Sequence, residues 1–146
     1  MARYVATVRS RRAVDEAFEY LADFSSVEEW DETAVRARML GEEPGLGTEF
    51  EVVVRFAGRE LPFVYRTTTF ERPGRLVFTA ESSTVVSEDT ITFRPGADGG
   101  SEVTYDADLR PKGLLKLADP ILALMLKRLG DNAKAGLERE LNGPAT

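Results

Sequence analysis

The sequence predicts an α+β fold, in which an antiparallel sheet of about seven strands wraps around one long C-terminal helix. The helix is indicated by residues 119–141, where apolar side chains recur at three- and four-residue steps. The sheet is indicated by residues 34–109, where apolar and polar residues alternate with a period of two. Because the turns between these strands are short, neighbouring strands are expected to pair antiparallel. Helices separated from a continuous run of strands are typical of the α+β class.

Asp119 and Pro120 mark the start of the C-terminal helix, because Asp caps free N–H groups and Pro is tolerated at the first helical position. Gly130 and Gly136 lie inside the helix, where each Gly costs roughly 1 kcal/mol relative to Ala. A close approach of the sheet, a bend or space for a ligand would each explain them. The helix must bury its apolar stripe against the sheet, and this arrangement can leave a cavity between the two. The stripe comprises Ile121, Leu122, Met125, Leu129, Ala133, Leu137 and Leu141.

The elements before this helix begin with a strand at residues 4–9 and a helix at residues 14–21. A second, short helix runs to Trp30. We expect residues 1–146 to form one domain, with a C-terminal helical segment at residues 114–142 and a tail at residues 143–146. Six further strands are expected at residues 35–39, 49–56, 63–70, 76–81, 85–93 and 103–109.

Composition argues against several classes of function. The net charge is −6 and the basic residues are scattered among acidic ones, whereas nucleic-acid binding needs clustered Lys and Arg. The absence of His and Cys removes the commonest catalytic base, the thiolate nucleophiles and the usual zinc ligands, so neither a metal site nor a cofactor is expected. No run approaches the roughly 18 apolar residues of a membrane span, and the N-terminus lacks a signal-peptide core. A cytoplasmic location is the default expectation.

Several short motifs resemble those of the START-like, Bet v 1-like helix-grip superfamily (SRPBCC), in particular its polyketide cyclase/dehydrase-like branch. The resemblance covers essentially the whole chain and rests on the order and spacing of these motifs. It implies a curved antiparallel sheet that grips the C-terminal helix, with an elongated apolar cavity between them. Members include carriers of lipids, hormones and sterols, and aromatic polyketide cyclases. The motifs are Ala22-Asp23-Phe24, Glu29-Trp30-Asp31, Gly45-Leu46-Gly47-Thr48, Glu71-Arg72-Pro73-Gly74, Lys112-Gly113 and Asp119-Pro120.

Residues on the inward face of the strands and on the helix stripe are candidates to bind a ligand in this cavity. The alternative is that they fill a closed core, that Trp30 plugs it, and that the hydroxyl groups bond to the backbone. Phe70 is expected on the opposite, outer face of its strand. The candidates are Trp30, Phe50, Val52, Val54, Phe63, Tyr65, Thr67, Phe78, Asp89, Tyr105, Leu122, Met125 and Leu129.

Asp89 shares the side of its strand with Val85, Ile91 and Phe93. If these residues face inward, burial would raise the pKa of the Asp89 carboxyl and could make it a general base or an anchor for a ligand hydroxyl. We favour a bulge or shifted register at residues 86–89 that turns Asp89 to solvent.

Three functions fit the sequence. The first is binding of a hydrophobic or aromatic small molecule, lipid- or polyketide-like, without turnover. The second is a polyketide cyclase or dehydratase, in which Asp89, Tyr65 or Tyr105 would carry protons in place of His. The third is an interaction protein, whose apolar segment at residues 114–129 meets a membrane surface or a second copy in a homodimer. We expect the first, with the second as the alternative.

Overall fold

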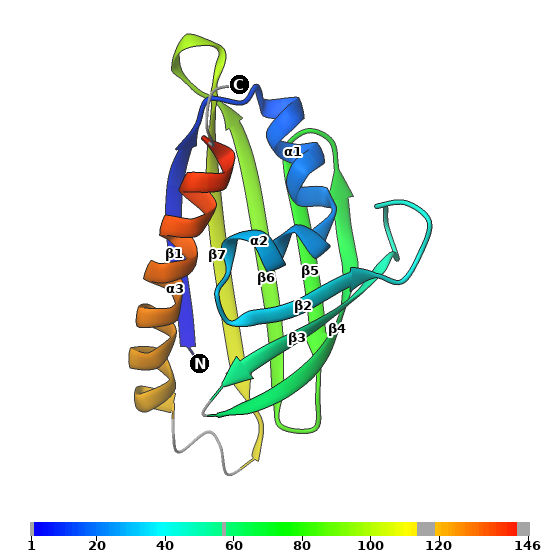
Figure 1. The fold of residues 1–146 in the computed structure, drawn as a ribbon, viewed down its shortest axis with the longest axis vertical. Coiled ribbons are helices and arrows are strands. Elements are labelled where there is room, and N and C mark those ends of the chain that lie inside the picture. Colours follow the sequence, from blue (N-terminus) through cyan, green and yellow to red (C-terminus); the bar gives the residue numbers. More distant parts are fainter. Residues whose placement is uncertain (1, 57, 114–118, 143–146) are drawn as a thin grey trace.

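The computed structural model of the chain describes residues 2–56, 58–113 and 119–142 and has the predicted α+β architecture, a curved antiparallel sheet against a long C-terminal helix (Figure 1). The elements are β1 (Ala2–Ser10), α1 (Val14–Ala22), the 3-10 turn η1 (Phe24–Ser26), α2 (Val27–Trp30), β2 (Ala34–Met39), β3 (Glu49–Phe56), β4 (Arg59–Glu71), β5 (Arg75–Glu81), β6 (Val85–Pro95), the 3-10 turn η2 (Ala97–Gly99), β7 (Ser101–Pro111) and α3 (Asp119–Leu141).

The strands form one sheet of seven with the order β1-β7-β6-β5-β4-β3-β2. Every neighbouring pair is antiparallel, as predicted. The chain reaches the far edge through α1, η1 and α2, so β1 pairs with β7 and not with β2. All three α-helices lie over the same face of the sheet, and α3 packs against β1 and α2 (Figure 1).

Strand β4 departs from the predicted pattern at both ends. It begins at Arg59, four residues before the predicted start, and Pro62 lies within it opposite Val53. Near its other end, the register with β5 shifts between Thr67 and Thr69. This bulge turns Phe70 to the inner face, where its ring meets Phe18 edge to face at 5.3 Å. The prediction that Phe70 faces outward was therefore wrong.

Strand β6 corrects the prediction for Asp89. Its pairing with β5 and β7 continues without a register shift through residues 86–89. Ser87, Asp89, Ile91 and Phe93 therefore point to the same inner face, and Asp89 is only 7% exposed. The favoured interpretation, a bulge that turns Asp89 to solvent, was wrong because both neighbouring strands hold β6 in regular alternation.

An aromatic cluster closes the core under η1. The Phe24 ring stacks on Phe78 at 4.3 Å and meets Tyr65 edge to face at 5.1 Å. Phe50 packs against Phe78 at 5.8 Å. On the helix side, Leu137 and Leu141 of the predicted stripe are fully buried. This end of the space between sheet and helices is filled.

The two helix glycines lie where α3 approaches other elements most closely. A Cβ atom on Gly136 would overlap the carbonyl oxygen of Trp30 at the end of α2. A Cβ atom on Gly130 would overlap the ring of Tyr4 on β1. Close approach of the sheet, one of the three reasons predicted, therefore accounts for Gly130, whereas Gly136 is explained by the close approach of helix α2, which was not predicted.

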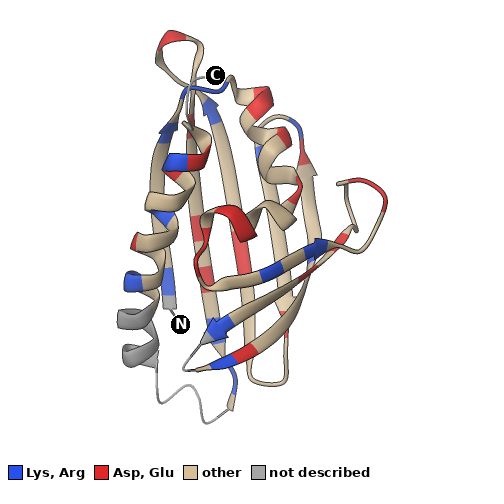
Figure 2. Ribbon diagram, in the orientation of Figure 1, with Lys and Arg blue, Asp and Glu red and all other residues tan. Residues whose placement is uncertain are grey.

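Charged residues of both signs are scattered over the strands (Figure 2). Several form ion pairs between neighbouring strands, including Arg3 with Asp106 and Arg94 with Glu102. Within the described part of the chain, no helix has the length and apolar character that crossing a membrane requires. Residues 114–118, the side chains of residues 119–125 and the tail at residues 143–146 lie outside the described structure. Most of the segment expected to meet a membrane or a second copy is therefore undescribed.

Candidate ligand-binding site

A pocket of about 400 Å³ lies between the sheet and α3, within the roughly 300–1,000 Å³ typical of small-molecule sites. It extends from Trp30 and Leu137 beside the filled core toward the start of β4 at Leu61 and the end of β7 at Pro111. Its lining is mostly apolar and comes mainly from β1, α2 and the turn after it, β3, β4, β6, β7 and α3. The apolar side chains that line it include Val8, Val54, Phe63, Leu126, Leu129 and Ala133.

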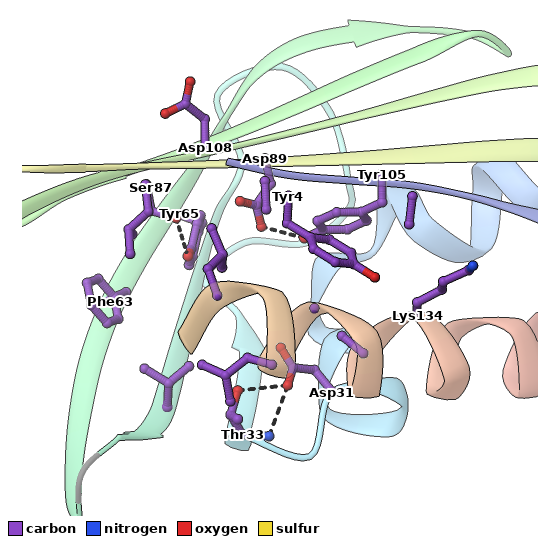
Figure 3. Close-up of a pocket in the computed structure, with 18 of the residues that line it drawn as sticks. Tyr4, Asp31, Thr33, Phe63, Tyr65, Ser87, Asp89, Tyr105, Asp108 and Lys134 are labelled. Carbon is purple, nitrogen blue, oxygen red and sulfur yellow. Dashed lines mark hydrogen bonds between the residues drawn. The ribbon is translucent and has the colours of Figure 1, made fainter. Parts of the chain in front are cut away.

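Four polar side chains on the sheet form one side of the pocket, here called the polar wall: Tyr65, Ser87, Asp89 and Tyr105 (Figure 3). The hydroxyl groups of Tyr65 and Ser87 share a hydrogen bond of 2.9 Å. The Tyr105 phenol donates a hydrogen bond to Asp89 Oδ2. The polar wall thus holds two linked pairs inside a mostly apolar pocket.

Small residues on neighbouring strands leave room for the polar wall. Ala80 on β5 pairs with Ser87, and β5 separates β4 from β6, so the Tyr65 ring reaches Ser87 across a short side chain. Ala107 on β7 pairs with Asp89, and Tyr105 reaches Asp89 diagonally from two residues away. Such diagonal neighbours are within reach of an aromatic side chain in an antiparallel pair.

Burial raises the pKa of the Asp89 carboxyl from 3.8 to about 7. The hydrogen bond from Tyr105 opposes this shift, whereas the nearby charge of Asp31 adds to it. Burial, together with the Asp89 charge, raises the pKa of the Tyr105 phenol well above 10.0. The Asp89–Tyr105 pair can therefore hold or release a proton near neutral pH at the carboxyl group, while the phenol stays a hydrogen-bond donor.

Asp31 supplies a second carboxylate from the opposite wall of the pocket, in the turn after α2 (Figure 3). Its Oδ1 accepts hydrogen bonds from the backbone N–H of Thr33 at 2.9 Å and from the Thr33 hydroxyl at 2.7 Å. Burial raises the Asp31 pKa, and the two bonds from Thr33 oppose that shift. This Asx turn holds the half-buried carboxylate in place.

Trp30 is both a plug and a pocket wall, the two roles left open by the sequence. It is 3% exposed, and its ring meets Tyr105 edge to face at 5.4 Å while lining the pocket. Its indole N–H is buried without a partner among the described residues. Its backbone carbonyl lies against Gly136, so helix α3 holds it from the other side.

The structure divides the predicted ligand-binding residues into two groups. Phe50, Val52, Thr67 and Phe78 are not among the lining residues, and they belong to the closed core, where the Thr67 hydroxyl donates to the Thr48 carbonyl at 2.9 Å. The side chains of Leu122 and Met125 lie outside the described structure. The candidates that line the pocket are Trp30, Val54, Phe63, Tyr65, Asp89, Tyr105 and Leu129.

The polar lining residues that sequence reasoning missed include Asp31, Ser87 and Tyr4. Tyr4 donates a hydrogen bond from its phenol to Asp131 Oδ1 at 2.6 Å and so joins β1 to α3. Ser87 shares the parity of Asp89, so it would have followed from a regular β6. The spacing Asp31-x-Thr33 is an Asx-turn pattern and was a usable signal.

Comparisons with known proteins agree with this architecture. The family model described as "Polyketide cyclase / dehydrase and lipid transport" matches residues 1–142. No curated protein matches the chain.

Solved structures share the fold at low sequence identity. A START superfamily protein from Mycobacterium smegmatis has a TM-score of 0.79 at 12% identity, with 97% of each chain covered. A protein from Thermus thermophilus has a TM-score of 0.76 at 13% identity, over 96% of this chain and 95% of that one. The major latex-like protein 151 of Panax ginseng has a TM-score of 0.71 at 10% identity, over 97% of this chain and 98% of that one. At such identities the likeness concerns the fold alone.

Proposed function

Because the chain belongs to the polyketide cyclase/dehydrase and lipid transport family, we propose that it binds a hydrophobic or aromatic small molecule, lipid- or polyketide-like, between the sheet and α3. Membership confirms the resemblance to START-like and Bet v 1-like helix-grip proteins. Family and fold are consistent with a hydrophobic ligand, while the kind of ligand is our inference from the pocket.

The observation that carries the proposal is the pocket itself. Its volume of about 400 Å³ accepts a compact organic molecule, and its walls are mostly apolar side chains with one group of polar residues. Burying apolar ligand surface contributes roughly 25 cal/mol per Å². The polar wall then orients the ligand through its hydroxyl and carboxyl groups, which is the usual division of labour in small-molecule sites.

The sole tryptophan offers a direct test of this function. Trp30 lines the pocket, so a bound ligand changes its surroundings and hence its fluorescence. We expect saturable changes on titration with an apolar ligand. The variant Ala133→Phe fills the pocket from α3 and should no longer show these fluorescence changes. The control Ala135→Phe makes the same substitution at an exposed position of the same helix and should still show them. Equal titration of both variants would contradict the proposed site.

The second candidate function is acid–base catalysis on a poly-β-keto chain, as in a cyclase or dehydratase. The Asp89–Tyr105 pair favours it, because a carboxyl with a pKa of about 7 in a pocket suits proton transfer at neutral pH. Such a carboxylate could abstract an acidic proton between two ketones, and a phenol could donate to the enolate oxygen that forms. Turnover of a poly-β-keto analogue that Asp89→Asn abolishes, with binding retained, would establish this function. Binding without turnover would leave the carrier role.

A further inference from the structure

Two carboxylates that reach into the pocket, Asp89 and Asp31, each leave one oxygen free for a ligand, whereas the carboxyl of a third lining residue, Asp108, points away from them (Figure 3). Asp89 accepts the Tyr105 phenol at Oδ2, and Asp31 accepts both bonds from Thr33 at Oδ1. Among the described residues, no donor lies within hydrogen-bond distance of Asp89 Oδ1 or of Asp31 Oδ2, although hydrogen bonding by the nearby Ser87 hydroxyl also lowers the Asp89 pKa. Neither oxygen is among the fully buried side-chain atoms that lack a partner. Figure 3 shows the two side chains reaching into the pocket from opposite walls. A ligand that lies between Asp89 and Asp31 therefore meets a hydrogen-bond acceptor on each side.

The basic residues of the pocket lining do not offset these carboxylates. Arg55 is exposed, and its guanidinium pairs with Glu60 Oε2 at 3.1 Å. Lys134 is exposed on α3, and its amino group points away from Asp89 and Asp31 (Figure 3). On the polar wall, the Tyr105 phenol is already engaged by Asp89, and the Tyr65–Ser87 pair has one hydroxyl hydrogen left to donate. The indole N–H of Trp30 has no partner among the described residues, but its nitrogen is fully buried. The described interior therefore offers a ligand more accessible acceptors than donors.

We propose that this pocket selects apolar ligands that carry a hydrogen-bond donor, a hydroxyl or ammonium group that reaches Asp89 or Asp31, and rejects the carboxylate with the same skeleton. This inference rests on the proposed binding function and names its ligand class. A donor satisfies a carboxylate oxygen that would otherwise stay unpaired in an apolar space, and bonds to charged acceptors are the stronger kind. A ligand carboxylate would instead be desolvated beside two like charges, and the described cations of the lining, Arg55 and Lys134, are exposed and directed away from those charges or paired elsewhere.

The test compares three ligands with one alkyl chain: decanol, decylamine and decanoic acid. Their dissociation constants for the full chain are measured by calorimetry at a pH above the Asp89 pKa of about 7. We expect the alcohol and the amine each to bind at least about tenfold more tightly than the acid. If ammonium is the preferred donor, the amine exceeds the alcohol and loses affinity as Asp89 is protonated. If hydroxyl is the preferred donor, decanol binds more tightly than decylamine.

Variants assign the preference to the two carboxylates. The double variant Asp31→Asn/Asp89→Asn should weaken the amine and strengthen the acid, each by about tenfold or more. The control Glu102→Gln removes one negative charge on the outer face of β7, outside the pocket. It should leave the dissociation constants of all three ligands unchanged.

The outcomes separate this inference from the function on which it rests. Decanoic acid that binds as tightly as decanol to the wild-type chain would overturn the proposed ligand class and leave the binding function standing. If the folded double variant still bound the alcohol and the amine more tightly than the acid, the proposed ligand class would likewise be overturned and the binding function would be unaffected. A folded wild-type chain that binds none of the three would overturn the binding function and the ligand class together. The comparison of the three ligands on the wild-type chain tests the ligand class by itself, even if the double variant does not fold.

Discussion

The Tyr105 phenol on β7 donates to the Asp89 carboxylate on β6, inside a mostly apolar pocket. Asp89 pairs across the strands with Ala107, so Tyr105 reaches it from two residues away over a short side chain. This contact gives a buried carboxyl one fixed donor and leaves its second oxygen facing the pocket. The proposed ligand binding and the proposed acid–base chemistry both depend on this contact.

The raised pKa of Asp89 predicts a pH-dependent stability. The folded carboxyl has a pKa of about 7, against 3.8 in the unfolded chain, so the folded state binds more protons between these values. Wild-type stability therefore falls as pH rises through this window, and the penalty is complete above it. Asp89→Asn lacks this carboxyl, so its stability relative to wild type should increase with pH. We expect a change of at least about 1 kcal/mol, because one pKa unit corresponds to about 1.4 kcal/mol.

Chemical denaturation of both proteins across this pH window measures the difference directly. The charged and titratable groups around Asp89 are Tyr105 on β7, Tyr65 on β4 and Asp31 after α2, with the Asp106 charge farther off. All of them remain in the variant and largely cancel in the comparison. A difference that stays flat, or that falls with pH, would contradict the buried placement of Asp89.

Tyr105→Phe should destabilise the fold and raise the Asp89 pKa further. The change removes the donor to Asp89, and this bond is the main influence that lowers its pKa. Leaving a buried acceptor unpaired costs about 1–3 kcal/mol. NMR titration of the Asp89 side-chain carboxyl measures the pKa, and denaturation measures the stability. Tyr20→Phe removes a solvent-exposed bond from the phenol of half-buried Tyr20 to the exposed Glu29 carboxylate and should cost less.

Gly136→Ala should destabilise the protein although Ala favours helices. The new Cβ atom would overlap the Trp30 carbonyl, so α3 has to move away from α2. We expect a loss of about 1–3 kcal/mol, which is typical of overpacking. Asn132→Ala, at an exposed position of the same helix, controls for helix propensity and should be neutral or stabilising. A Gly136→Ala variant as stable as wild type would show that α3 does not approach α2 so closely.

Phe78 and Phe63 should respond differently to truncation, because Phe78 lies in the closed core and Phe63 lines the pocket. Phe78→Ala should cost about 3–5 kcal/mol of stability. Phe63→Ala should cost less, since its partly buried ring faces the pocket, and should alter ligand affinity more. Thermal unfolding and Trp30 fluorescence titration measure the two effects. A larger loss of stability in Phe63→Ala than in Phe78→Ala, with a larger change of ligand affinity in Phe78→Ala, would contradict this division between core and pocket.

The fold class followed from local patterns in the sequence, whereas the order of strands did not. Alternation at Phe50, Val52 and Tyr65 correctly identified the inner face, because each strand exposes one side to a single core. The pairing of β1 with β7 has no local signal, since it depends on where the intervening helices carry the chain. Local alternation also cannot reveal the shift at Thr67–Thr69, so Phe70 was assigned to the wrong face.

Parity alone located only part of the site. It put Asp89, Tyr65 and Tyr105 on the inner side of their strands, yet the hydrogen bonds between strands depend on register. Ser87 meets Tyr65 because Ala80 lies between them on β5, and the sequence of either strand alone does not contain that relation. Asp31 enters the pocket from a turn, where no strand or helix period applies.

Native mass spectrometry of the purified chain, followed by organic extraction, tests the central claim most directly. We predict a stoichiometric small molecule that leaves on denaturation, is mostly apolar and carries a hydroxyl or amine. The matched Ala133→Phe protein should emerge without it. A ligand-free mass for the wild-type chain, with no thermal shift across lipids, sterols and aromatic polyketides, would contradict the claim that this pocket is a binding site.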